Sequence, residues 1–97
     1  MLNSISILDI GNLNNVNIID LRNKNLYDKE HIRGAINIPF EKILLNPNMY
    51  LSRNIKYYIY CQKGFSSRNV TLELSRLGYN VVNLQGGYEL YKKHKWL

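Results

Sequence analysis

Apolar residues along this chain fall in short blocks separated by Asn, Gly, Ser and charged residues, as a packed fold requires. Several blocks are short and rich in β-branched or aromatic residues, which is typical of strands. The five predicted strands span residues 4–6, 17–20, 35–38, 56–61 and 81–84. Because the later strands alternate with helix-like stretches, we expect an α/β fold, a small parallel five-stranded sheet with helices on both faces.

The clearest helical pattern follows the fourth predicted strand. Val70, Leu74 and Leu77 recur at spacings of four and three residues, which predicts one apolar helix face. Gly78 suits the left-handed position just past the end of that helix. The two serines at 66–67 are candidates to cap its first amide groups.

The fourth predicted strand, KYYIYC, carries large apolar or aromatic side chains on both of its faces. This pattern indicates a central strand that is covered on both sides. Ligands of open parallel sheets bind beyond the carboxyl ends of the strands. Cys61, the only cysteine, stands at this end, and the loop QKGFSS leads from it into the helix. The position therefore indicates a site.

The length and the net charge of the chain limit the classes of protein to which it can belong. With 97 residues there is room for a single domain, residues 1–97. Thirteen Lys and Arg against seven Asp and Glu give a net charge of +6, which favours anionic partners. The basic residues are scattered except for a short run at 92–95, so we expect no nucleic-acid partner.

Composition also bears on compartment and cofactors. No apolar run reaches the length of a membrane span, and the amino end lacks the basic start of an export signal, so we expect no membrane partner. One Cys cannot form an internal disulfide, and with two His it cannot build a thiolate-rich zinc site. We expect a reduced thiol, no metal or other cofactor, and a cytoplasmic location.

The loop after Cys61 can activate a thiol. Only the thiolate is nucleophilic, and a free cysteine, with a pKa of about 8.5, is mostly protonated near neutrality. Backbone N–H groups that curl around the sulfur would stabilise the anion, with Gly64 permitting the tight turn and the helix dipole adding to it. Lys63 and Arg68 add positive charge. The alternative is that Cys61 is a small buried hydrophobe at a strand end.

Three stretches of the sequence resemble the rhodanese-like domain family. YCQKGFSS is similar to its active-site loop, in which a cysteine opens a six-residue loop, here Cys61 to Ser66. The segment at 18–40 matches an upstream signature of Asp-x-Arg followed by His-Ile-x-Gly-Ala-x-Asn-Ile-Pro. The segment at 81–91 matches a downstream strand, Gly-Gly turn and helix. Ser66 departs from the family because many members carry Arg there, and Tyr91 replaces a frequent Trp.

The resemblance implies a sulfurtransferase of the small single-domain thiosulfate type, with a rhodanese-like fold and no cofactor. Cys61 would attack the outer sulfur of a small anionic donor such as thiosulfate, carry it as a persulfide, and pass it to a thiol, on a protein or a small molecule, or to cyanide. The expected substrate-binding residues form the rest of the loop and the helix start: Gln62, Lys63, Gly64, Phe65, Ser66, Ser67 and Arg68.

Two other functions compete with this one. A cysteine phosphatase needs an Arg six positions after the Cys to clamp phosphate, but position 67 is Ser and Arg68 comes one residue late. The phosphatase is therefore disfavoured. A sulfur carrier or protein-interaction module, loaded by a partner protein and with little turnover of small molecules, stays open because the same persulfide chemistry serves it.

The upstream signature holds residues for which we expect structural roles. Asp20 and Arg22 are expected to tie a strand end to a neighbouring loop, and His31 to be a hydrogen-bonded packing residue instead of a base. Gly34 is expected in a backbone turn closed to other residues. Phe65 is expected at the rim of the pocket, in contact with a substrate or a partner protein.

Overall fold

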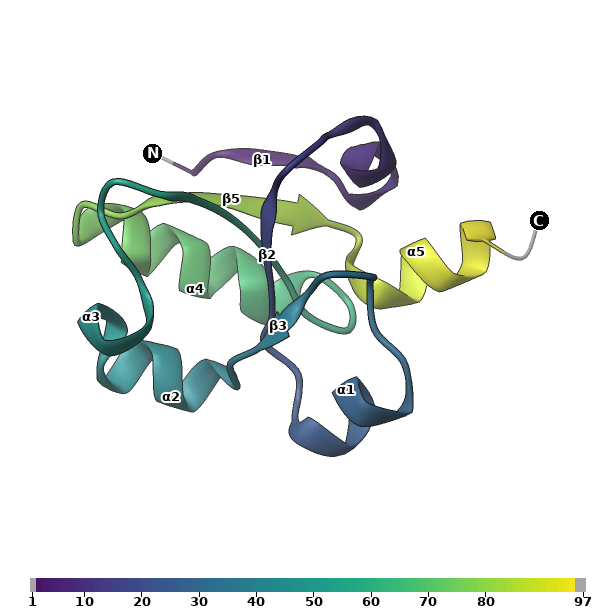
Figure 1. Cartoon of the computed structure of the whole chain (residues 1–97), viewed down its shortest axis with the longest axis horizontal. Coiled ribbons are helices and arrows are strands. Elements are labelled where there is room, and N and C mark those ends of the chain that lie inside the picture. Colours follow the sequence, from purple (N-terminus) through teal and green to yellow (C-terminus); the bar gives the residue numbers. More distant parts are fainter. Residues whose placement is uncertain (1, 96–97) are drawn as a thin grey trace.

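The computed structural model describes residues 2–95 and contains one sheet of five parallel strands (Figure 1). The strands are β1 (Ser4–Ser6), β2 (Asn17–Asp20), β3 (Ile36–Asn37), β4 (Lys56–Tyr60) and β5 (Asn80–Gln85). They pair in the order β1-β5-β4-β2-β3. The expected parallel five-stranded sheet is confirmed, and so is the central place of the strand that precedes Cys61.

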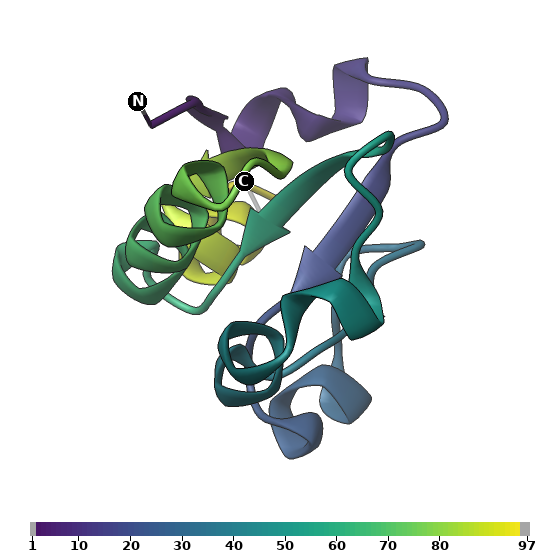
Figure 2. The ribbon, with the colours of Figure 1, turned by 90° about the vertical axis from the view of Figure 1, so that its left-hand side faces the viewer.

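Helices cover both faces of this sheet, as expected. One core cluster contains Ile43, Val70 and Leu74, from α2 (Phe40–Leu45) and α4 (Phe65–Arg76). The 3-10 helix η1 (Ile7–Asn12) and α5 (Gly87–Lys95) contribute to the opposite cluster. The remaining helices are α1 (Lys24–Lys29) and α3 (Pro47–Tyr50). Figure 2 shows α4, in green, alongside the sheet.

Two details of α4 differ from the sequence prediction. The serines at 66–67 do not cap the helix: it begins at Phe65, after Gly64 in the left-handed conformation at φ 96°, with no side-chain cap. Gly64 turns the chain into the helix earlier than a serine cap would. Leu77 is 46% exposed because the helix ends at Arg76. Gly78, at φ 93°, follows the helix end as predicted.

The upstream signature behaves as the sequence indicates. Gly34 lies in a turn at φ 86°, a conformation that other residues rarely adopt. His31 stacks on the ring of Tyr27 at 3.7 Å between centroids, and its Nδ1 is 2.7 Å from the Tyr27 carbonyl oxygen. His31 is thus a hydrogen-bonded packing residue at the surface, and its predicted structural role is confirmed.

Candidate active site

Cys61 follows the last residue of β4 and lies at the carboxyl edge of the sheet. The residue is 6% exposed, yet its sulfur lies among polar groups. The backbone N–H groups of Gly64 and Ser67 donate to Cys61 Sγ at 3.1 and 3.2 Å. A third polar contact joins Sγ to Ser67 Oγ at 3.3 Å. An environment of this kind stabilises a negative sulfur, unlike the apolar pocket of a purely structural cysteine.

The sulfur takes the place of the missing helix cap. Ser67 is the third residue of α4, and its N–H is one of the amides that an N-cap side chain ordinarily satisfies. Here Cys61 Sγ accepts that hydrogen bond. The positive end of the helix dipole therefore acts on the sulfur directly.

The carbonyl side of the loop is held by the start of α5. The N–H of Tyr88 donates to the Cys61 carbonyl at 2.8 Å, and that of Glu89 donates to the Gln62 carbonyl at 2.9 Å. Gly87 lies so close that a Cβ on it would meet the Gln62 oxygen at 2.6 Å and the Cys61 oxygen at 2.7 Å. The Gly-Gly turn is thus a supporting element of the site, a role that the sequence reasoning did not assign.

Arg22 fixes the loop from the other side. Its guanidinium donates to both oxygens of Asp20, to Gln62 Oε1 at 3.2 Å and to the Glu30 carbonyl at 2.7 Å. Burial alone would lower the pKa of Arg22, but the hydrogen bond and charge of Asp20 outweigh it and raise the pKa. The permanent ion pair ties β2 to the cysteine loop, so the predicted structural role of Asp20 and Arg22 is confirmed.

Cys61 borders two surface cavities of about 260 Å³ each. The first is also lined by Gln62, Lys63, Phe65 and Ser66. The second includes Arg22, Leu26, Phe40 and Glu41. Phe65 is 74% exposed, as expected for a residue at the rim. Gln62, Lys63, Phe65 and Ser66 therefore share a cavity with Cys61, and their substrate-binding role stays a prediction.

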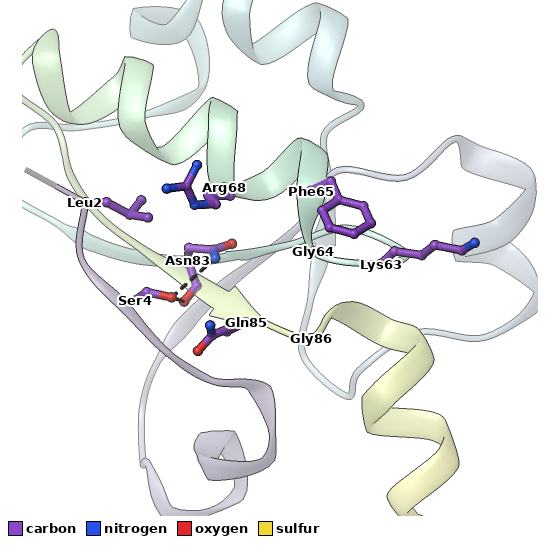
Figure 3. Close-up of a pocket in the computed structure, with 9 residues that line it drawn as sticks. All are labelled: Leu2, Ser4, Lys63, Gly64, Phe65, Arg68, Asn83, Gln85 and Gly86. Atoms are coloured by element: carbon purple, nitrogen blue, oxygen red, sulfur yellow. Dashed lines mark hydrogen bonds between the residues drawn. The ribbon is translucent and has the colours of Figure 1, made fainter.

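Arg68 lies apart from these cavities. It lines a pocket of about 210 Å³ behind the loop, together with Ser4, Asn83 and Gln85, and Cys61 is not among the lining residues (Figure 3). Figure 3 also shows the Lys63 side chain pointing away from Arg68. Lys63 borders this pocket as well as the first cysteine cavity, so it shares a cavity with Cys61 whereas Arg68 does not. The substrate-binding role of Arg68 stays a prediction.

Asn83 is the buried residue that the sequence reasoning missed. It interrupts the apolar run of β5, is 2% exposed, and its Oδ1 accepts a hydrogen bond of 2.7 Å from Ser67 Oγ. The Asn in the middle of the otherwise apolar run VVNL is the feature of the sequence that could have indicated this buried polar residue.

Within residues 2–95, no cluster of His, Cys, Asp and Glu is suited to hold a metal ion. Nor is any helix of that part long and apolar enough to cross a bilayer.

This chain belongs to the rhodanese-like domain family, whose model matches residues 6–94. It is 32% identical over 78 residues to the thiosulfate sulfurtransferase GlpE of Coxiella burnetii, covering 79% of this chain and 72% of that protein. It is also 32% identical over 73 residues to the putative sulfur carrier protein YrkF of Bacillus subtilis, covering 74% of this chain but 39% of the relative.

Solved structures agree with the family assignment. The crystal structure of SSP1007 from Staphylococcus saprophyticus superposes with a TM-score of 0.83 at 35% identity, covering 93% of each chain. The fold predicted from the resemblance is therefore confirmed. The names of the relatives support a sulfurtransferase in general terms.

Proposed function

We propose that this protein is a sulfurtransferase that moves a sulfane sulfur from thiosulfate, or a similar anionic donor, to a thiol or cyanide through a persulfide on Cys61. The observation that carries the proposal is the pair of backbone N–H groups, from Gly64 and Ser67, that donate to Cys61 Sγ at the start of α4. The name of the GlpE relative supports thiosulfate as the donor.

The first half-reaction is a displacement at sulfur. The Cys61 thiolate attacks the outer sulfur of thiosulfate, the S–S bond of the donor breaks, and sulfite leaves with its electron pair. The product is an anionic persulfide on Cys61. The amides that bind the thiolate are suited to bind this persulfide too, as an oxyanion hole stabilises a developing negative oxygen.

The second half-reaction returns the enzyme to its starting state. A thiolate or cyanide attacks the outer sulfur of the persulfide, and the Cys61 thiolate is the leaving group. No net oxidation of the protein occurs, and no cofactor enters this scheme. Lys63 attracts the charged end of the donor, since it borders the same cavity as Cys61. A thiol that must stay reduced fits a cytoplasmic location.

Mass spectrometry of the intact protein tests the proposal. After incubation with thiosulfate, we expect a gain of one sulfur atom, which cyanide removes as thiocyanate. Cys61→Ser abolishes the gain. Hydrolysis of para-nitrophenyl phosphate by the wild-type protein, without any sulfur gain, would instead identify a phosphatase.

A sulfur carrier is the second candidate, and the named carrier YrkF is the observation that favours it. In that case a partner desulfurase loads Cys61, and small donors react poorly. The same mass measurement separates the two functions. A persulfide that forms with a desulfurase and its cysteine substrate, but not with thiosulfate, would establish the carrier.

A further inference from the structure

Asn83 is a buried polar side chain that the sulfur-transfer scheme leaves without a role. Its neighbours along β5, Val82 and Leu84, are buried and apolar, and a buried amide is tolerated only when its polar atoms are paired. The register of the sheet sets Asn83 opposite Ser4. Figure 3 shows its side chain beside Ser4 and near Arg68 on α4, behind the cysteine loop.

A chain of hydrogen bonds joins Asn83 to the sulfur. Asn83 Nδ2 donates to Ser4 Oγ at 3.3 Å, and Asn83 Oδ1 accepts from Ser67 Oγ at 2.7 Å. Ser67 Oγ in turn lies 3.3 Å from Cys61 Sγ. The hydroxyl of Ser67 has one proton. Its oxygen lies 2.7 Å from Asn83 Oδ1 and 3.3 Å from the Gly64 carbonyl oxygen, and the shorter bond, to Asn83, uses that proton. Its lone pair therefore faces the sulfur, an arrangement that suits a protonated thiol as donor.

An anionic sulfur needs the opposite arrangement, because it can only accept hydrogen bonds. The two ends of an Asn amide are nearly equal in size, so Asn83 can turn by about 180° without repacking. Nδ2 then donates to Ser67 Oγ, and the Ser67 hydroxyl donates to the sulfur. At the far end, the Ser4 hydroxyl donates to Oδ1. Both orientations leave the three side chains paired, although in the turned one the Ser4 hydroxyl gives up its 3.3 Å bond to the Asn83 backbone carbonyl. The thiol proton leaves to water.

We propose that Asn83 is a positioning residue that turns with the charge of Cys61, so that Ser67 accepts from the thiol but donates to the thiolate and the persulfide. The persulfide part rests on the proposed function, whereas the thiolate part does not. The charged groups that line the cavities of Cys61 are Arg22, Glu41 and Lys63, with Arg68 behind the loop. These charges determine the electrostatic field at the sulfur, and Asn83 determines the direction in which the Ser67 hydroxyl points.

Nuclear magnetic resonance of the wild-type protein tests the turn without any substitution that could unfold it. We expect the side-chain amide signals of Asn83 to shift with the pH midpoint at which Cys61 becomes reactive to iodoacetamide. Asn17, whose amide donates to the Lys56 carbonyl at the far end of the sheet, is the control and should not follow that midpoint. Ser67→Ala keeps Asn83 close to the sulfur but breaks the relay, so the shift should collapse. A shift that persists in Ser67→Ala would overturn the proposal.

A matched pair of charge variants tests the donor role of the amide. Asn83→Asp replaces an amide that can donate by a carboxylate that only accepts, which locks the Ser67 hydroxyl away from the sulfur. We expect the alkylation midpoint to rise by about one pH unit, a tenfold loss of thiolate at lower pH. Gln85→Glu adds the same charge two residues along the same strand and lines the pocket behind the loop. Its midpoint should rise by less than half as much, and equal shifts would refute the relay.

These measurements use alkylation and resonance shifts, not sulfur transfer. A wild-type protein that shows the Asn83 titration but gains no sulfur from thiosulfate would keep the relay and reject the proposed enzyme. A protein that gains sulfur, with an Asn83 signal that ignores the state of Cys61, would do the reverse.

Discussion

At the scale of single residues, the site depends on a buried cluster of Tyr60, Asp20 and Arg22, of which Arg22 borders a cavity that Cys61 also lines. The hydroxyl of Tyr60 donates to Asp20 Oδ2 at 2.6 Å and accepts from the N–H of Ile32 at 3.2 Å. Asp20 in turn holds Arg22, which binds the Gln62 side chain. Burial, and then the hydrogen bond to Asp20, raise the pKa of Tyr60 far above the ordinary value for tyrosine. Tyr60 therefore stays neutral and supports the ion pair that anchors the loop.

Tyr60→Phe should destabilise the fold by about 1–3 kcal/mol, because a buried carboxylate oxygen and a buried amide each lose a partner. The difference should also depend on pH. The pKa is raised in the folded state, so the contribution is complete below pH about 10, where the unfolded chain still holds its proton. It is lost as the pH rises further. Urea unfolding measures this. The difference in free energy of unfolding between wild type and Tyr60→Phe should be smaller near pH 11, at about the upper end of tyrosine titration, than at neutral pH.

Tyr58→Phe is the control for this measurement, because Tyr58 lies in the same strand, half-buried, with no hydrogen bond of its hydroxyl among residues 2–95. Its effect should be within about 0.5 kcal/mol. A difference in free energy of unfolding between wild type and Tyr60→Phe that stays constant with pH would contradict a raised pKa of Tyr60 in the folded protein.

At the scale of elements, the loop after β4 and the turn before α5 form one unit. Gly64 and Gly86 approach so closely that a Cβ on Gly64 would meet the Gly86 nitrogen at 3.1 Å. The first amides of α5 bind the carbonyls of Cys61 and Gln62. As a result the amide side of the loop is free to face the sulfur. The geometry of the sulfur site is thus built by two helix starts that are distant in sequence.

Gly87→Ala should disturb this unit, because the new methyl group would lie within 2.7 Å of two backbone carbonyl oxygens. We expect lower stability and a changed rate of Cys61 alkylation. Gly34→Ala is the matched control: Gly34 also has positive φ, but a Cβ there meets nothing within 4 Å. It should cost only the strain of a left-handed residue, about 1–2 kcal/mol, and leave the alkylation rate unchanged. Equal changes of alkylation rate in both variants would show that strain alone matters.

The sequence could predict the elements better than their ends or their polar contacts. Hydrophobic runs identified the five strands, and the double-sided pattern of KYYIYC identified the central one. The prediction of a serine cap for α4 was wrong. The Cys61 sulfur, which lies outside the helix, accepts the amide hydrogen bond that a serine side chain would have accepted. Asn83 was missed because its partners Ser4 and Ser67 come from two distant segments. Such partners follow from sheet register and helix packing, which no local pattern records.

At the scale of the whole molecule, the parallel sheet gathers the reactive groups at one edge and leaves other charges at the opposite edge. Cys61 follows the carboxyl end of β4, while Lys56 begins the same strand. The net charge of +6 attracts anions to the molecule as a whole. A cation beside the sulfur should do more, since interactions between exposed charges fade within about 10 Å at 0.1 M salt.

Lys63 should therefore speed the reaction of Cys61 with an anionic reagent through its charge. Two unit charges 4 Å apart in bulk water interact by about 1 kcal/mol, so removing the Lys63 charge should change the rate by at most roughly fivefold. We expect Lys63→Ala to slow alkylation by iodoacetate by up to this factor at low ionic strength and to leave the reaction with neutral iodoacetamide nearly unchanged. Lys56→Ala removes the same charge from the far end of β4 and should have little effect. In about 1 M salt, where the screening length falls to about 3 Å, the two variants should react alike. A deficit of Lys63→Ala that survives high salt, or that iodoacetamide shares, would mean that Lys63 shapes the loop and does not steer anions.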